Sequence, residues 1–103
     1  MKFTDYQAAT HATAIYPKDR ALEYLALGLA GEAGEVAGKV SKVLRDGHYD
    51  PVALAAELGD VLWYLAQLAS TLDADLADIA AANLAKLQAR LQKGTLGGSG
   101  DNR

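Results

Sequence analysis

Alanine and leucine fill most hydrophobic positions of the chain, and the few β-branched residues are scattered. Helix is therefore favoured almost everywhere, and no strand pattern competes with it. We predict four helices, over about residues 3–15, 20–45, 51–72 and 75–93. The pattern indicates an all-α fold, with one helical domain over residues 1–94 and a glycine-rich tail over residues 95–103.

Residues that favour helix ends mark the boundaries of these elements. Thr4 and Gln7 have the spacing of a capping box in the first helix, and Asp19 is expected to cap the second. Asp50 followed by Pro51 predicts the start of the third helix. The second and fourth helices are each followed by a glycine that can adopt the left-handed backbone of a helix exit, namely Gly47 and Gly94.

The second and third helices have unusual compositions. The second contains four interior glycines, each costing roughly 1 kcal/mol relative to alanine: Gly28, Gly31, Gly34 and Gly38. Such glycines indicate close approach of a neighbouring helix or a ligand. Apolar residues surround the third helix apart from Glu57, Asp60 and Gln67, which predicts a buried helix. A chain this short buries only about two-thirds of its unfolded surface, so we expect subunits to share part of the core.

Acidic residues form two matched pairs in these helices. Glu32 and Glu35 lie three residues apart in the second helix, and Glu57 and Asp60 repeat that spacing in the third. The spacing places each pair on one helix face, with Cβ atoms roughly 5–6 Å apart. If the short connection over residues 46–50 folds the helices into an antiparallel hairpin, the two pairs face each other.

Four carboxylates in an apolar setting repel one another, and a divalent cation resolves that conflict. Ligands that are all oxygen suit Mg²⁺, with Mn²⁺ as a substitute. Neither His11 nor His48 belongs to a Glu-x-x-His motif, which argues against a di-iron bundle. We therefore predict a magnesium site.

The alternative is that these acids are solvated helix-surface groups, each paired with a cation one turn away. Glu35 and Lys39 have that spacing. The other three acids, however, are followed four residues later by Val36, Val61 and Tyr64. The ion-pair explanation thus covers one acid of the four.

The charge balance narrows the classes of function. The chain has 10 Lys and Arg residues against 13 Asp and Glu, a net charge of −3, and no cysteine. The negative charge excludes a strongly basic nucleic-acid coat. The absence of cysteine excludes a disulfide scaffold, a thiolate zinc site and a thiol nucleophile. No secretory pattern or membrane-spanning apolar run is apparent. We expect a cytoplasmic protein with no nucleic-acid or membrane partner.

The segments GLAGEAGEVAGKV and ELGDVLWYLAQLA resemble the MazG-like family of all-α nucleoside triphosphate pyrophosphohydrolases. The resemblance extends to residues 83–87, Arg90 and the terminal residues 97–103. It implies Mg²⁺-dependent hydrolysis of a (deoxy)nucleoside triphosphate to the monophosphate and pyrophosphate, in nucleotide-pool housekeeping. It also implies a four-helix fold that assembles as a homodimer or as a dimer-of-dimers tetramer.

The same resemblance implies roles for individual residues. The metal-binding and catalytic set would be Glu32, Glu35, Glu57 and Asp60. Glu32 would orient or deprotonate the attacking water. Gly31 stands where many relatives have a further glutamate, which argues against a second or third metal ion. The candidate substrate-binding residues are Lys39, Tyr64, Asn83, Lys86, Arg90 and Arg103.

Several of these residues also have ordinary structural explanations. Lys39 has the spacing of an ion-pair partner, and Lys86 and Arg90 lie late in a helix, where the dipole favours cations. Asn83, by contrast, favours a functional role, because an asparagine in mid-helix is unfavourable unless its amide has a partner. The glycine-rich tail, closed by Arg103, is either an anion-binding nest that orders with substrate or a frayed terminus.

Two other functions stay open. One is a phosphoribosyl-ATP pyrophosphohydrolase, an enzyme built on a related helical scaffold. The other is a non-catalytic helical oligomerisation module whose acids bind metal, or nothing, for structure. A panel of substrates separates these two alternatives from a nucleoside triphosphate pyrophosphohydrolase.

Overall fold

The computed structural model describes residues 1–103 and contains helices and connections only. Its four α-helices are α1 (Phe3–Thr10), α2 (Ala21–Asp46), α3 (Pro51–Thr71) and α4 (Leu76–Lys93). Two short 3₁₀ turns, η1 (His11–Thr13) and η2 (Lys18–Arg20), lie between α1 and α2. The predicted all-α, four-helix fold is confirmed.

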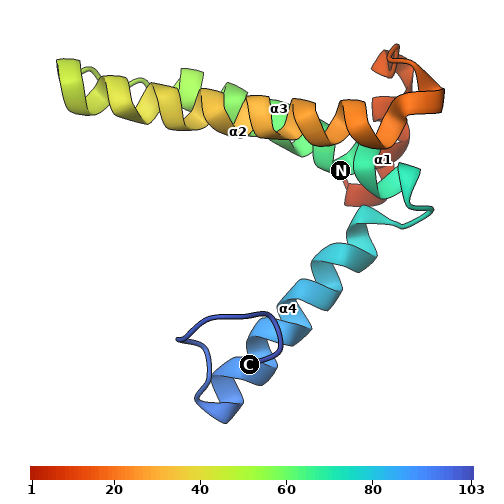
Figure 1. Ribbon diagram of the computed structural model, residues 1–103, viewed down its shortest axis with the longest axis vertical. Coiled ribbons are helices and arrows are strands. Elements are labelled where there is room, and N and C mark those ends of the chain that lie inside the picture. The colour runs from red at the N-terminus through yellow and green to blue at the C-terminus, as the bar shows by residue number, and fades with distance from the viewer.

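Helices α2 and α3 lie side by side as an antiparallel hairpin (Figure 1). Gly47 ends α2 with a left-handed φ of 72°, and its N–H donates to the Val43 carbonyl at 2.7 Å. Three positions after Gly47, the Asp50 carboxylate accepts the Ala53 N–H at 3.1 Å, with Pro51 in the first helical position. These are the expected stop and start signals, and together they reverse the chain within one short turn.

The start predicted for the first helix, at residue 3, is confirmed, but its predicted end and its predicted capping residues are wrong. The helix predicted over residues 3–15 ends at Thr10, because the Thr10 and Thr13 hydroxyls donate to carbonyls three residues earlier and the chain tightens into η1. Its start is capped by Asp5, whose carboxylate accepts the Lys2 N–H at 3.0 Å, and not by the pair Thr4 and Gln7.

The predicted Asp19 cap is also wrong. Asp19 lies inside η2, where the Arg20 N–H donates to the Pro17 carbonyl at 3.3 Å. Helix α2 therefore begins one residue later than predicted, at Ala21, with no side-chain cap. The Arg20 side chain instead pairs with Glu23 in the first turn of α2.

Buried Gln7 fastens α1 to the turn between α3 and α4. Its amide nitrogen donates to the Ser70 hydroxyl at 3.0 Å and to the Ala74 carbonyl at 2.9 Å. Its amide oxygen accepts the Leu76 N–H at 2.7 Å. Because every polar atom of this amide has a partner, Gln7 fixes the point from which α4 departs.

A second buried amide, Gln67, fastens the segment after α1 to α3. It donates to the Thr10 hydroxyl at 2.7 Å and accepts the Tyr16 hydroxyl at 2.6 Å. Nearby, the Trp63 indole N–H donates to the Thr13 hydroxyl at 2.8 Å. These bonds hold the N-terminal segment against the half of α3 that follows its acidic residues.

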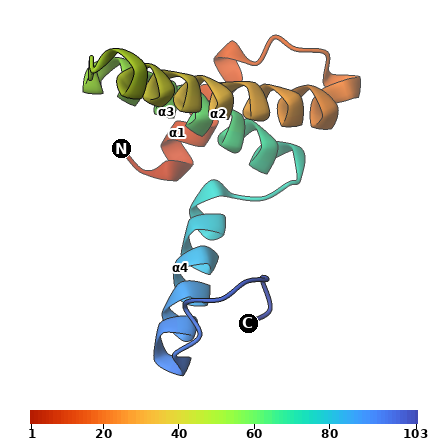
Figure 2. The same cartoon turned by 60° about the vertical axis from the view of Figure 1, so that its left-hand side comes forward.

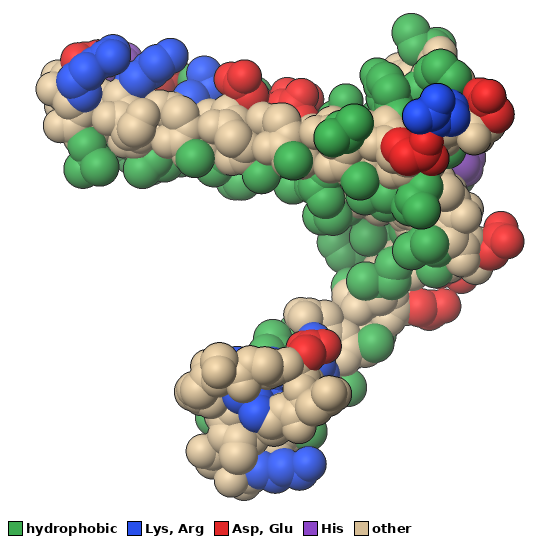
Figure 3. Space-filling view, in the orientation of Figure 1, with side chains coloured by type: hydrophobic (Ala, Val, Ile, Leu, Met, Phe, Trp, Pro, Cys, Tyr) green, Lys and Arg blue, Asp and Glu red, His purple; other side chains and the backbone are tan.

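Helix α4 diverges from the hairpin, so the chain has the shape of a V (Figures 1 and 2). Only 9 of 103 residues are buried, and the accessible surface is 7230 Å². A compact chain of this mass exposes about 5,500 Å². Figure 3 shows hydrophobic side chains along the lower face of the hairpin and in the notch of the V.

The prediction that the third helix is buried is wrong within a single chain. Only Ala66, Gln67 and Ala69 of α3 are buried, because α2 covers one face and α1 covers only one end. By length and composition alone, α3 is long and apolar enough to cross a membrane. Its middle nevertheless carries Glu57 and Asp60, whose transfer into hydrocarbon costs several kcal/mol. An apolar helix with two acids at its middle is typical of a protein core, and one face of this helix is uncovered in the single chain.

Candidate metal centre

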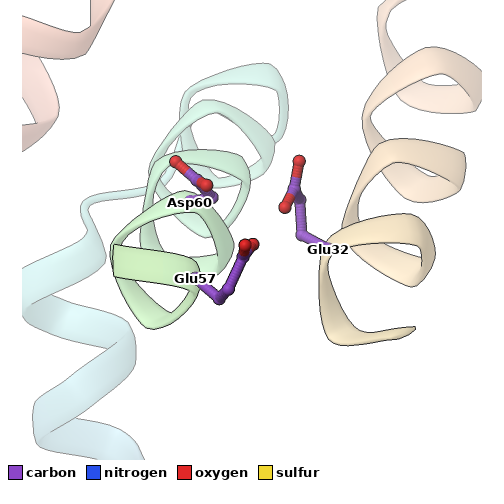
Figure 4. A group of neighbouring side chains, drawn as sticks. All are labelled: Glu32, Glu57 and Asp60. Atoms are coloured by element: carbon purple, nitrogen blue, oxygen red, sulfur yellow. The ribbon is translucent and has the colours of Figure 1, made fainter. Parts of the chain in front are cut away.

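Three carboxylates converge between the two helices of the hairpin (Figure 4). Glu32 comes from α2, and Glu57 and Asp60 come from successive turns of α3. One carboxylate oxygen of each lies within 4.8 Å of the others. The hairpin thus brings together residues that are 25 or more positions apart in the sequence, as the paired spacing predicted.

The electrostatics of this group are unfavourable without a cation. The pKa of Glu32 is raised, first by desolvation and then by the negative charges of Asp60 and Glu57. Glu35 makes the smallest contribution to that rise. The raised pKa means that the folded chain disfavours the ionised form of Glu32, and a divalent cation beside it would relieve this.

Lys39 is the cation nearest this group. Its Nζ lies 3.7 Å from Oε1 of Glu57 across the hairpin, and both side chains are partly buried. The surface pair between Glu35 and Lys39, which the spacing permits, is not among the ion pairs of the chain. Lys39 therefore belongs to the acidic centre.

Glu35 lies on the exposed side of α2, outside the group of three. Although it follows Glu32 by one helical turn, its charge contributes least to the raised pKa of Glu32. The structure thus brings together three of the four predicted acids, and the metal-binding role of Glu35 stays a prediction.

Tyr64 borders the acidic centre one turn beyond Asp60. Burial raises its pKa first, followed by the effects of Tyr24, Glu32 and Asp60. Its ring lies against the backbone of Gly28 on α2, where a Cβ atom would overlap it. Of the four interior glycines of α2, only Gly28 meets such a neighbour, so the expected close approach is confirmed there alone.

An aromatic group continues from Tyr64 toward the N-terminal segment. Trp63 and Tyr64 meet edge to face with ring centroids 5.0 Å apart, and Tyr16 stacks on Tyr24 at 5.2 Å. Tyr16 also meets Trp63 edge to face at 6.3 Å, which joins the two pairs. Sequence spacing indicated a contact for Tyr64, but it gave no signal for Tyr16, which reaches α3 through the Gln67 bond.

The remaining predicted substrate residues lie on the other arm of the V. They are Asn83, Lys86 and Arg90 on α4 and Arg103 in the tail. Because α4 projects away from the hairpin, one chain does not bring them to the acidic centre (Figures 1 and 2). Their contact with substrate stays a prediction.

The tail folds back on α4. Asp101 accepts hydrogen bonds from Lys86 at 2.8 Å and from Arg90 at 2.9 Å, and Arg90 also donates to the Asp101 carbonyl at 2.6 Å. These cations lower the pKa of Asp101. Arg103 donates to the Gly97 carbonyl at 3.0 Å and the Leu96 carbonyl at 3.2 Å. Sequence analysis missed this role of Asp101, because the pairing depends on the path of the tail, and residue spacing does not specify that path.

The donor set of the centre fits a hard divalent cation. Glu32, Glu57 and Asp60 offer oxygen atoms only. Their three negative charges exceed the single positive charge of Lys39 by two, which matches the charge of Mg²⁺ or Mn²⁺.

Comparison with known proteins found one family model and one relative that match the chain. Residues 20–95, which include all of α2, α3 and α4, match the family described as MazG nucleotide pyrophosphohydrolase domain. The chain is also 50% identical over 111 residues to the Gene 37 protein of Mycobacterium phage L5, covering 95% of this chain and 96% of that protein. No solved structure matches the chain.

Proposed function

We propose a function from one premise, which is that the chain belongs to the MazG nucleotide pyrophosphohydrolase domain family. The proposed reaction is hydrolysis of (deoxy)nucleoside triphosphates to the monophosphate and pyrophosphate. The observation that carries the proposal is the convergence of Glu32, Glu57 and Asp60 between α2 and α3. The proposed role is nucleotide-pool housekeeping in the cytoplasm.

Glu32, Glu57 and Asp60 are proposed to hold Mg²⁺, with Glu35 as a further ligand. Members of the family are typically metal-dependent, and the excess negative charge of the group supports the same requirement here. When bound, Mg²⁺ supplies stabilisation of negative charge on phosphate oxygens and lowers the pKa of water.

The residues of the chain have separate tasks in the proposed reaction. Glu32 orients the attacking water and accepts its proton as the water oxygen bonds to the α-phosphorus. The bond between the α-phosphorus and the bridging oxygen breaks, and pyrophosphate leaves with the electron pair. Lys39 neutralises charge on that leaving group, and Tyr64 contacts the nucleoside from the opposite end of the centre.

A homodimer, or a dimer of dimers, is proposed as the active form. Leu84 and Leu91 on α4 are 69% and 58% exposed, and α3 has an uncovered apolar face. Burial of such surface is the main driving force of association. Within one chain, the basic residues of α4 lie far from the acidic centre. A second copy would bring its own α4, with these basic residues, toward the acidic centre of the first copy.

A nucleotide panel assayed with and without Mg²⁺ tests the proposed activity. Pyrophosphate and monophosphate released only with metal would support it, whereas orthophosphate would contradict attack at the α-phosphorus. Phosphoribosyl-ATP belongs in the panel, because turnover of that substrate alone would favour the related enzyme. Absence of turnover with every substrate would favour a non-catalytic module.

Two substitutions tie the activity to the acidic centre. Glu35→Gln and Asp60→Asn should each lower the rate by about 100-fold or more, since each removes a proposed ligand. Full activity in both variants would contradict the assignment of these residues.

A further inference from the structure

The end of the hairpin next to the connection carries a pocket of about 170 Å³. The last turns of α2, the connection and the first turn of α3 form its walls. The residues that line it include Lys39, Lys42, His48, Tyr49, Ala53 and Leu54.

The pocket adjoins the acidic centre through Lys39. This side chain lines the pocket, and its Nζ lies 3.7 Å from Glu57. On α3, Ala53 lines the pocket one turn before Glu57, a separation of about 6 Å along the helix axis. A ligand that reaches one turn beyond the acidic centre would therefore enter the pocket.

The charge of the pocket is opposite to that of the acidic centre. Lys39 and Lys42 contribute positive charge, while His48 and Tyr49 add hydrogen-bonding groups. The only acid in its lining is Asp50, whose carboxylate already accepts the Ala53 N–H.

The nearby acid Asp46 is also engaged. It is bound through both carboxylate oxygens to Arg45, each at 2.8 Å. Lysine is a compact point charge that suits phosphate groups. The pocket is thus equipped for an anion that continues from the metal centre.

We propose that this pocket binds pyrophosphate, as the leaving group of the reaction and, before cleavage, as the β- and γ-phosphates of the substrate. The inference rests on the proposed function and adds a direction to it. The phosphate chain lies along the hairpin toward residues 39–49, and the nucleoside lies at the opposite end, beside Tyr64. Lys42 and His48 are binding residues in this arrangement.

Calorimetric titration of the full chain with pyrophosphate in the presence of Mg²⁺ tests this assignment. Lys42→Ala and His48→Gln should each weaken pyrophosphate binding by about tenfold, the loss expected for one charged hydrogen bond. Lys93→Ala, at an exposed lysine in the last turn of α4, is the matched control and should bind like the unmodified chain. Lys42→Arg keeps the positive charge and should retain the affinity.

Unchanged affinity in both Lys42→Ala and His48→Gln would overturn the assignment, as would an equal loss in Lys93→Ala or in Lys42→Arg. Circular dichroism checks that each variant keeps its helices. Nucleotide hydrolysis is measured separately on the same samples. If pyrophosphate binds through Lys42 and His48 but no nucleotide is hydrolysed, the proposed function is contradicted and the pocket assignment is not. If nucleotides are hydrolysed but pyrophosphate binding is insensitive to both residues, the pocket assignment is contradicted and the proposed function is not.

Discussion

The ring of Tyr64 on α3 occupies the space that a side chain at position 28 of α2 would fill. A Cβ atom placed on Gly28 overlaps the ring and comes within 2.8 Å of its hydroxyl oxygen. The glycine therefore lets the two helices approach closely at one point, next to the carboxylates of Glu32 and Asp60. It sets the position of the aromatic ring that borders the acidic centre.

Replacing Gly28 with alanine should displace the Tyr64 ring and raise KM for a nucleotide, with a smaller effect on kcat. The added methyl group contacts the ring and not the acids, so nucleoside binding should suffer before chemistry does. Steady-state kinetics would measure this. Gly34→Ala is the control, because no atom outside its local helix lies within 4 Å of the added Cβ. Equal KM values in the two variants would contradict the role given to Gly28.

Replacing Asp60 with asparagine should raise the Tm of the metal-free chain at neutral pH and abolish the rise in Tm on adding Mg²⁺. After desolvation, the charge of Asp60 raises the pKa of Glu32 more than any other neighbouring charge does. A carboxyl whose pKa is raised by folding costs stability as the pH rises through that pKa. The metal-free chain should therefore lose stability over that range, and Asp60→Asn should lose less.

Thermal melts over a pH series, with and without Mg²⁺, measure both effects. Asp78→Asn, in the first turn of α4, is the control and should leave the response to Mg²⁺ intact. A metal-induced rise in Tm that persists in Asp60→Asn would count against the centre.

Replacing Asp101 with asparagine should release the tail at neutral pH. The lowered pKa of Asp101 means that its contact with Lys86 and Arg90 contributes stability above the usual pKa of an aspartate. That contribution is lost as the pH falls through the lowered value, so acid should release the tail of the unmodified chain. NMR order parameters of the Gly98 and Gly100 backbone report the release. Order parameters that are equally high in Asp101→Asn would contradict the account of the tail.

Light scattering after gel filtration should give twice or four times the chain mass of 10.8 kDa. Leu84→Glu places a charge on the exposed apolar face of α4 and should lower the measured mass toward that of a single chain. Ala82→Glu adds the same charge two residues earlier, on the opposite side of α4, and is the control. A single-chain mass for the unmodified protein would refute the proposed assembly.

The hairpin and its acids could be predicted because their signals are local. Gly47, Asp50 and Pro51 determine the reversal, and helical periodicity places Glu57 and Asp60 on one face of α3. Glu35, which the same spacing paired with Glu32, lies outside the group of three. The V shape could not be predicted, since it depends on Gln7 bonding to groups 63 and more residues away. The same holds for the pairing of Lys39 with Glu57, because spacing alone offered Glu35 as the nearer partner.

The position of α4 relative to the acidic centre is the largest difference between expectation and structure. Lys86 and Arg90 share a helix face, as their spacing indicated, but that face meets Asp101 of the tail. Periodicity describes which residues of one helix lie together and carries no information on how distant helices are arranged. Contact of these cations with the substrate is therefore proposed to involve a second chain.

Hydrolysis in ¹⁸O-labelled water tests the central claim most directly. The chain, Mg²⁺ and a deoxynucleoside triphosphate are incubated in labelled water, and the products are analysed by mass spectrometry. Attack at the α-phosphorus predicts the label in the monophosphate and none in pyrophosphate, with no labelled product from Asp60→Asn. Label in pyrophosphate, or in orthophosphate, would contradict the proposed reaction.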